Sequence, residues 1–380
     1  MAKNGKEKQR HALLTAGLCI ALVLLVAALF SPHLSLGFGD FDNGQWYGEA
    51  KARNTLWKAL DYTQNTGYTP STYYQPVQTL VWAAMVKAVD NEPYWYYALG
   101  MAIHASSAIV LFLLMHELTG KFLPSFGAAA SFAVFFPNYQ TFSWISAAIT
   151  HGLTGLFFAT TLLMYVRHSK TGSRTYYALS VAAFAVGVLT KEITVFAVPI
   201  IFAYYVLLER RGGLRPVSSD LKVVPFAALV LPFVYISRVI LSRSVVMSEW
   251  GGVNFGVHML YRFMDYLSYL ASVVPISLGL RLVFAYAALL ILPILAYYAS
   301  RDRMLAYMGV WLALSISMFV YTNFRDVYSI GRYLYVPSMA WFGLLFYGVS
   351  RIRDSILRSW SYAALISYGF VLNAALILFG

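Results

Sequence analysis

Residues 12–30 read ALLTAGLCIALVLLVAALF, an uninterrupted apolar run that follows a basic segment containing Lys3, Lys6, Lys8 and Arg10. Crossing a bilayer takes roughly 20 apolar residues, whereas the core of a signal peptide has about 7–15. We therefore predict a retained transmembrane helix, and this helix sets the class of the whole fold.

The rest of the chain has the same apolar character. Of its 380 residues, 59% are hydrophobic and 12% are charged, about half the charged share of a soluble domain. This composition excludes a cytosolic enzyme and a disordered chain. The single cysteine, Cys19, excludes a disulfide scaffold. In a membrane protein, the net charge of +12 reports topology before it reports a nucleic-acid partner, and we predict no such partner.

Further apolar runs lie at 95–117, 122–136, 141–166, 175–189, 193–208, 222–241, 281–299, 304–322, 333–350 and 360–379. If the N-terminus is cytoplasmic and the spans alternate, the basic connections fall inside, at Arg167/Lys170/Arg174, Arg210/Arg211/Arg215/Lys222, Arg301/Arg303 and Arg351/Arg353/Arg358. We predict an all-α polytopic transmembrane bundle of about 11 spans. It would lie in the cytoplasmic membrane, N-terminus inside and C-terminus outside.

Two long segments then face outward, residues 31–94 and 242–280. The first contains amphipathic patterns at 45–61 and 77–89, and the second has an apolar part at 266–280. We predict interfacial helices for all three. With no repeat and no soluble domain in the sequence, residues 1–380 are expected to form one membrane-embedded unit.

The charges outside the cytoplasmic connections gather at outer helix ends and in the outer loops, which favours a site at the outer face over a path through the bilayer. Asp40 and Asp42 follow the first span in a glycine-rich turn, where paired carboxylates can act as a general base or ligate a metal. The alternative is a solvated turn that caps the next helix.

Two outer cations are candidates for binding a phosphate. Lys191 precedes Glu192 in a short connection, where the two side chains either pair with each other or leave the lysine to bind an anion. Arg332 precedes Tyr333 at the start of a span, where it either anchors the helix or holds a lipid phosphate. Arg262 is a further outer-side cation.

The residues just before Pro76 and the two histidines within predicted spans each allow two interpretations. Tyr73, Tyr74 and Gln75 precede Pro76, a typical first helical residue, and form either an interfacial helix start or a substrate contact. His104 and His151 lie within predicted spans without a metal-ligand partner at suitable spacing, which favours buried, hydrogen-bonded histidines over zinc ligands.

Taken in order, these clusters resemble the C-superfamily (GT-C) of integral-membrane glycosyltransferases, and within it the transmembrane O-mannosyltransferases with tetratricopeptide tails. The matching segments are Asp40/Asp42, Tyr73–Val77, Glu92–Tyr97 leading to His104-Ala105, Phe136-Pro137 with Trp144–Ser146, Leu189–Glu192 and Arg332–Ser338. The chain departs from the family pattern at Gln75, often Arg, at Thr150-His151, near an expected acidic residue, and at Gly331, commonly Glu. A tetratricopeptide tail is absent from the sequence.

The resemblance implies an inverting glycosyltransferase that moves a hexosyl or pentosyl group from a polyprenyl-phosphate donor to a glycan or protein acceptor outside the cytoplasm. Asp40 or Asp42 would be the general base. Lys191, Arg332 and Arg262 would bind the donor phosphate, and the substrate contacts would be Tyr73, Tyr74, Gln75, Glu192, Tyr333 and His104. No cofactor is required, although Mg²⁺ or Mn²⁺ held by Asp40 and Asp42 is compatible with the carboxylates.

Three other functions share parts of this pattern. A lipid-linked sugar flippase or transporter has a similar span count but typically carries charges along a central cavity. A surface-polysaccharide polymerase or ligase typically places its key residues in a large late outer loop, whereas here the early loop is larger. A non-catalytic membrane scaffold would tolerate substitution of Asp40 and Asp42.

Overall fold

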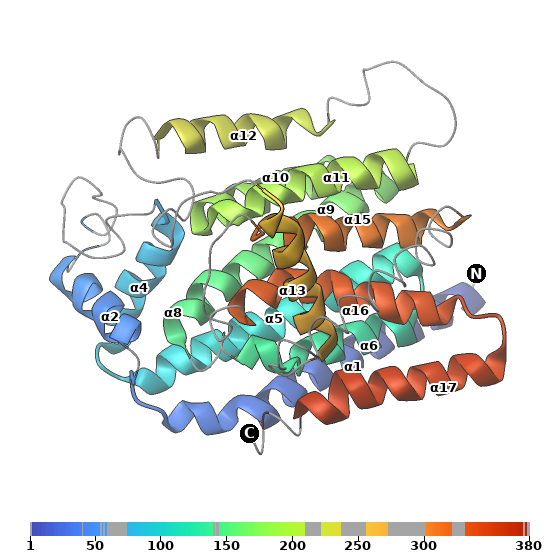
Figure 1. The fold of residues 1–380 in the computed structure, drawn as a ribbon, viewed down its shortest axis with the longest axis horizontal. Coiled ribbons are helices and arrows are strands. Elements are labelled where there is room, and N and C mark those ends of the chain that lie inside the picture. Colours follow the sequence, from blue (N-terminus) through green and yellow to red (C-terminus); the bar gives the residue numbers. More distant parts are fainter. Residues whose placement is uncertain are drawn as a thin grey trace.

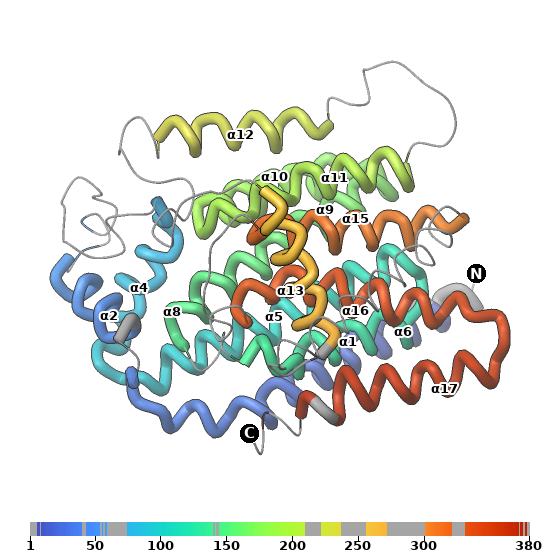
Figure 2. The backbone as a smooth tube through the Cα atoms, in the orientation of Figure 1, coloured from blue at the N-terminus to red at the C-terminus, as the bar shows by residue number. Residues whose placement is uncertain are grey.

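The computed structural model describes residues 2–39, 41–53, 55, 58, 74–139, 141, 144–209, 222–236, 256–272, 301–320, 331–374 and 377. Within these ranges every regular element is a helix and no strand occurs, so the predicted all-α class is confirmed. The long helices run side by side along the longest axis (Figures 1 and 2). Helices α2 and α4 lie at one end, hereafter the α2 end, and the chain's N-terminus lies at the other, hereafter the N-terminal end.

The main bundle consists of α1 (Ala2–Phe30), α5 (Pro93–Thr119), α6 (Phe122–Ala133), α9 (Leu153–Thr171), α10 (Arg174–Thr190), α11 (Ala197–Tyr204), α15 (Arg303–Ser317) and α16 (Tyr335–Ser350). The central helix is α5, which packs against α1, α6, α9 and α16. Outside this bundle, α12 (Val224–Tyr235) contacts α10, and α17 (Ser355–Ile366) contacts α16. No residue of α17 is buried, as expected of a helix that faces lipid.

Shorter elements complete the α2 end. They are α2 (Phe41–Arg53), α4 (Pro76–Val89), α8 (Ile145–Ala147), the π-helical turn Ala148–Gly152, and the 3-10 turns Glu192–Phe196 and Gly331–Leu334. In Figure 1, α13 (His258–Ser272) crosses in front of the bundle, and its Tyr266 ring packs on Phe319 next to α15. Further π-helical turns follow α11 and α17, at Tyr205–Glu209 and Ser367–Leu372. A short 3-10 helix, Ser31–Ser35, follows α1.

Glycines at two helix ends make the antiparallel packing of neighbouring helices possible. Gly120 ends α5 in the left-handed conformation (φ 69°), and its N–H donates to the carbonyl of His116 at 2.8 Å. Gly172 ends α9 in the same way (φ 72°), donating to His168 at 2.7 Å. Residues with a side chain rarely adopt this backbone conformation, whereas glycine does so at little cost. The chain can therefore reverse within a few residues.

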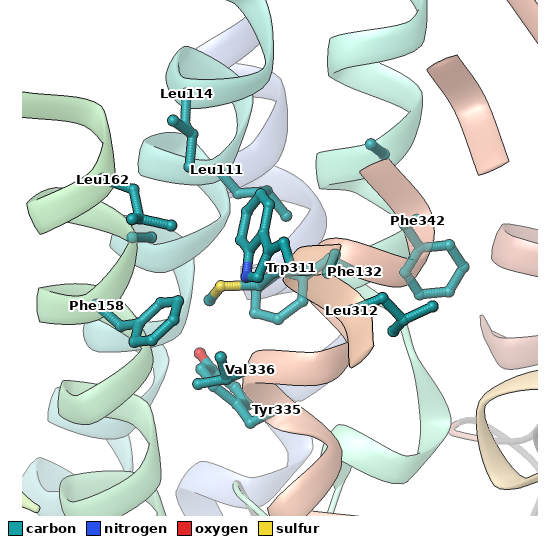
Figure 3. Packing of buried hydrophobic residues seen from close by; sticks show 14 of the residues in the cluster. Leu111, Leu114, Phe132, Phe158, Leu162, Trp311, Leu312, Tyr335, Val336 and Phe342 are labelled. Carbon is teal, nitrogen blue, oxygen red and sulfur yellow. The ribbon is translucent and has the colours of Figure 1, made fainter. Parts of the chain in front are cut away.

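Close packing of aromatic and aliphatic side chains fills the middle of the bundle. Trp311 of α15 is completely buried and lies among the side chains labelled around it in Figure 3. Gly155 of α9 lies against the ring of Tyr335, where an added Cβ would come within 2.4 Å of the ring. Lipid tails are as apolar as leucine, so such van der Waals contacts, rather than exclusion of water, hold membrane helices together.

The predicted spans agree with this architecture as far as it is described. Each overlaps a described helix except 281–299, which lies outside the described residues. By length and composition, four of the described helices can cross a bilayer, namely Gln9–Ser35, Pro93–Thr119, Ile145–Thr171 and Glu192–Glu209. The chain is an integral membrane protein, and the count of about 11 spans stays a prediction.

The helices predicted at the interface differ in their bounds. Helix α4 matches the predicted 77–89, but α2 begins at Phe41, earlier than the predicted 45, because the polar residues before Trp46 join its first turn. Helix α13 begins at His258 rather than 266, because its buried face also includes Met264. The prediction counted only the continuous apolar part of this segment.

Candidate functional site

Lys191 is a buried cation at the α2 end. Helix α10 ends at Thr190, and Lys191 follows in an extended conformation (φ −159°, ψ 136°). Its N–H donates to Gly187 at 2.9 Å and its carbonyl accepts from the N–H of Thr194 at 3.1 Å. These bonds hold the lysine backbone between α10 and the following 3-10 turn. Only 3% of the residue is exposed.

The ammonium group of Lys191 has no carboxylate oxygen within 4.0 Å among the described residues. Nζ of Lys191 also has no hydrogen-bond partner among the described residues, and this atom is not completely buried. Burial lowers the pKa of Lys191; the charge of Glu192 opposes this shift and the charge of Arg332 adds to it. A buried cation without a contacting anion is costly, so this position favours the binding of an anionic ligand.

Arg332 interacts electrostatically with Lys191, although the two residues are distant in sequence. Its guanidinium carbon lies 4.3 Å from the centroid of the Trp144 ring and 5.1 Å from that of Tyr333. One guanidinium N–H also donates to the Tyr333 hydroxyl at 3.3 Å. These ring contacts orient the planar donor group of Arg332, a geometry suited to phosphate oxygens.

His151 lies in the same cluster. It belongs to the π-helical turn Ala148–Gly152, is 5% exposed, and meets the ring of Tyr333 edge-on with the centroids 5.1 Å apart. The charges of both Lys191 and Arg332 act on its ring. Among the described residues, no group hydrogen-bonds to its ring nitrogens, which differs from the hydrogen-bonded histidine that the sequence favoured.

The segment that carries the two predicted catalytic carboxylates is fixed to this cluster by Asn43. The fully buried Asn43 donates from Nδ2 to the carbonyl of Phe38 at 3.0 Å and accepts the N–H of Ser146 at 3.0 Å. Ser146 follows two residues after Trp144, on which Arg332 stacks. The first turn of α2 therefore lies beside the segment that orients Arg332.

The predicted catalytic residues themselves fall outside what the structure describes. Asp40 and the side chain of Asp42 lie outside the described residues, although Asp42 belongs to the first turn of α2. Among the described side chains, no three His, Cys, Asp or Glu residues gather at a metal site. The roles of Asp40 and Asp42 as base or metal ligands stay predictions.

The residues before α4 occupy a helix start. Tyr73 lies outside the described residues. The ring of Tyr74 packs against Phe233 of α12, with the centroids 5.9 Å apart. Gln75 is buried before the first turn of α4, and its carbonyl accepts the N–H of Thr79 at 3.1 Å. These contacts fit the interfacial-helix interpretation, and substrate contacts by these residues stay predictions.

Arg262 and His104 occupy other environments. Arg262 lies on α13, where its guanidinium is 3.9 Å from the carboxylate of Asp265. His104 of α5 is 1% exposed; its Nε2 hydrogen-bonds the carbonyl of Ala133 at 2.9 Å and its Nδ1 the hydroxyl of Tyr335 at 2.8 Å. Since both ring nitrogens of His104 are used within the core, this geometry favours a packing role over the predicted substrate contact.

Three residues of the cluster had no role in the sequence prediction. The sequence analysis named Trp144 only as part of a motif and gave it no role. An aromatic residue near an interfacial arginine is, however, a common stacking partner. Asn43 sits at a typical capping position, and its long-range bond to Ser146 has no local signal. His151 was set aside because no second metal ligand lies nearby in sequence.

No protein-family model and no curated protein sequence matches this chain. The crystal structure of ArnT from Cupriavidus metallidurans bound to undecaprenyl phosphate matches 93% of the chain at 15% identity, with a TM-score of 0.51. The chain shares the fold of this protein. The crystal structure of the Archaeoglobus fulgidus oligosaccharyltransferase, in its apo form, matches 96% of it at 12% identity, also with a TM-score of 0.51.

The chain spans 62% of the length of the ArnT chain and 56% of that of the oligosaccharyltransferase. Both are larger proteins, and at these identities the likeness concerns the fold alone. The narrower resemblance to the transmembrane O-mannosyltransferases stays a prediction from the motifs.

Proposed function

We propose that this protein is a glycosyltransferase that takes its sugar from a polyprenyl-phosphate donor bound at the α2 end. The observation that carries the proposal is the convergence of Lys191 and Arg332, with the lysine buried and without a contacting carboxylate among the described residues. The ArnT neighbour, which was crystallised with undecaprenyl phosphate, supports a lipid phosphate as the anion.

The two cations suit the leaving group of this reaction. When the bond between the sugar C1 and the phosphate oxygen breaks, its electron pair stays on the phosphate and the negative charge there increases. Lys191 supplies a compact positive charge, and Arg332 supplies planar donors held by Trp144. Fixed positive charge in a site of low dielectric stabilises this developing charge more than water does.

The acceptor side of the reaction needs a base. An acceptor hydroxyl loses its proton as its oxygen attacks C1 from the face opposite the phosphate, which inverts the sugar. Asp40 or Asp42 is our candidate, since the Asn43–Ser146 hydrogen bond anchors their segment beside the cation cluster. Their two carboxylates are also the proposed place for Mg²⁺ or Mn²⁺ should the reaction use one.

The position of the site defines the compartment. We propose that the α2 end faces outward from the cytoplasmic membrane and that the N-terminus is cytoplasmic. The acceptor, a glycan or a protein, would then lie outside the cytoplasm. The basic residues Arg167, Lys170 and Arg351 lie near helix ends at the N-terminal end, which agrees with the usual excess of positive charge on the cytoplasmic side.

The test is transfer from a polyprenyl-phosphate sugar by the purified full chain in proteoliposomes. We expect transfer by the native protein and loss of transfer in Asp40→Asn or Asp42→Asn, whichever carboxylate is the base. Full activity in both variants would remove the proposed base. Flux of a labelled lipid-linked sugar without covalent transfer would instead support the flippase alternative.

A further inference from the structure

We propose that His151 is a third group that binds the donor phosphate, and that it takes up a proton when the phosphate binds. This inference rests on the proposed function, because it assumes that the phosphate lies between Lys191 and Arg332. The observation behind it is the placement of a buried histidine in a π-helical turn, with its ring against Tyr333 and subject to the charges of both cations.

Small residues fix the direction of the π-helical turn. An added Cβ on Gly100 of α5 would lie 3.0 Å from Cβ of Ala148, and one on Gly152 would lie 3.0 Å from Ile103. The turn therefore packs tightly against α5 on its Ala148 and Gly152 side, while the ring of His151 meets Tyr333. Single π-helical turns within α-helices occur frequently at functional sites.

The neighbouring elements bring few other titratable groups to His151. On α5, the Tyr97 hydroxyl donates to the carbonyl of Gly37 at 3.1 Å, and both ring nitrogens of His104 are hydrogen-bonded in the core. On α4, Lys87 lies in the last turn and is exposed, at the opposite end from Gln75. The π-helical turn itself and α8 carry no other titratable residue.

Three residues, Lys191, Arg332 and Tyr333, act on or contact the ring of His151. The charges of Lys191 and Arg332 act on its ring, Tyr333 presents its ring to it, and Glu192 acts on Lys191 and Tyr333. Tyr333 is neutral near pH 7, because a phenol ordinarily loses its proton only at about pH 10. The charges that His151 meets in the described structure are therefore positive.

A bound phosphate changes this balance. Two fixed positive charges repel a third one, and a phosphate placed between them attracts it. A protonated imidazole gains a second N–H donor, and its hydrogen bond to a phosphate oxygen is charge-assisted. Proton uptake by His151 would thus strengthen donor binding, and loss of that proton would accompany release of the polyprenyl phosphate.

The test is isothermal titration of the purified full chain with the methyl ester of undecaprenyl phosphate, whose phosphodiester carries one fixed negative charge and cannot itself accept the proton. Titrations near pH 7 in two buffers of different ionisation enthalpy give the number of protons taken up. We expect uptake of a substantial fraction of one proton by the native protein. In His151→Gln, which keeps a neutral donor, we expect no uptake and about tenfold weaker binding, equivalent to about 1.4 kcal/mol.

Each other outcome overturns the inference. Binding without proton uptake by the native protein would exclude the proton and leave the phosphate site of the proposed function intact. Uptake that persists in His151→Gln would assign the proton to Lys191 instead. No binding of the ester by the native protein would refute the phosphate site and this inference together. The number of protons taken up by the native protein alone decides whether binding is coupled to protonation. This part of the test therefore does not depend on whether His151→Gln folds.

Discussion

Lys191 differs in its ion pairing from the cations at the N-terminal end, and also from Lys51 and Arg53 of α2, which pair with Asp90 and Glu49. At the N-terminal end, Arg167 and Lys170 pair with Glu117 at 3.0 and 3.5 Å, and Arg351 pairs with Asp302 at 2.8 Å. At the α2 end, Lys191 is more deeply buried than any of these cations, and no carboxylate contacts it among the described residues.

This difference separates structural charges from charges available to a ligand. A cation paired with a carboxylate and partly hydrated is already compensated, and such pairs contribute about 0–1 kcal/mol to stability. A buried cation without a contacting anion costs free energy in the unliganded protein, and a bound anion recovers that cost. The contrast between Lys191 and the Glu117 pairs thus supports our proposal that Lys191 binds an anion.

The largest expected effect comes from removing the buried cation. Lys191→Ala should weaken binding of undecaprenyl phosphate by about 100-fold, the scale seen when one member of a buried charge pair is removed. Equilibrium binding to the purified variant measures this. The matched control is Lys121→Ala, since Lys121 donates to the carbonyl of Ser350 at the N-terminal end. Equal losses in both variants would break the comparison between the ends.

Raising the pH should also weaken donor binding, gradually and in the same direction as Lys191→Ala. Lys191 binds an anion only while protonated, that is, below its pKa, and burial lowers that pKa from the usual value of about 10.4. Affinity for the methyl ester of undecaprenyl phosphate should therefore fall with rising pH before an ordinary lysine would lose its charge. Lys191→Arg, whose guanidinium stays protonated, should lose less affinity over this range than the native protein, since only the proposed deprotonation of His151 still weakens its binding. A fall of equal size in native protein and Lys191→Arg would contradict this assignment.

Orientation of the second cation should matter less than the presence of the first. Arg332→Lys keeps the charge but loses the planar group that stacks on Trp144, so we expect about tenfold weaker donor binding. Trp144→Leu should reproduce part of this loss while leaving Arg332 in place. Unchanged affinity in both variants would show that the stacking does not orient a phosphate-binding group.

The smallest effect is expected at the opposite end. Glu117→Gln removes the partner of Arg167 and Lys170 and should change the free energy of unfolding by about 0–1 kcal/mol. Donor affinity should stay within twofold of native in the same binding assay. A loss comparable to that of Lys191→Ala would mean that the N-terminal end takes part in donor binding.

Long apolar runs and basic connections predicted most of the helices, because burial in lipid requires both apolar side chains and internally bonded backbone. The predicted start of α2 was wrong, since polar residues before Trp46 that carry no apolar pattern join its first turn. The predicted start of α13 was wrong because charged residues such as Arg262 and Asp265 interrupt the apolar pattern before residue 266.

The candidate site was predicted in part. Lys191 and Arg332 were predicted because they stand at helix ends within ordered motifs, and in the structure their charges interact. His151 was not, since its proposed role depends on its place in a π-helical turn that packs against Gly100, and no local pattern in the sequence predicts that turn. His104 was predicted to contact the substrate because of its place in a motif. The sequence alone could not show that Ala133 and Tyr335 hydrogen-bond both of its ring nitrogens.

The central claim is that the donor phosphate binds at the α2 end. An experimental structure of the full chain with undecaprenyl phosphate tests it most directly. We expect phosphate oxygens within hydrogen-bond distance of Nζ of Lys191 and of the guanidinium of Arg332. A phosphate bound instead beside Arg167, Lys170 or Arg351 at the N-terminal end would contradict it.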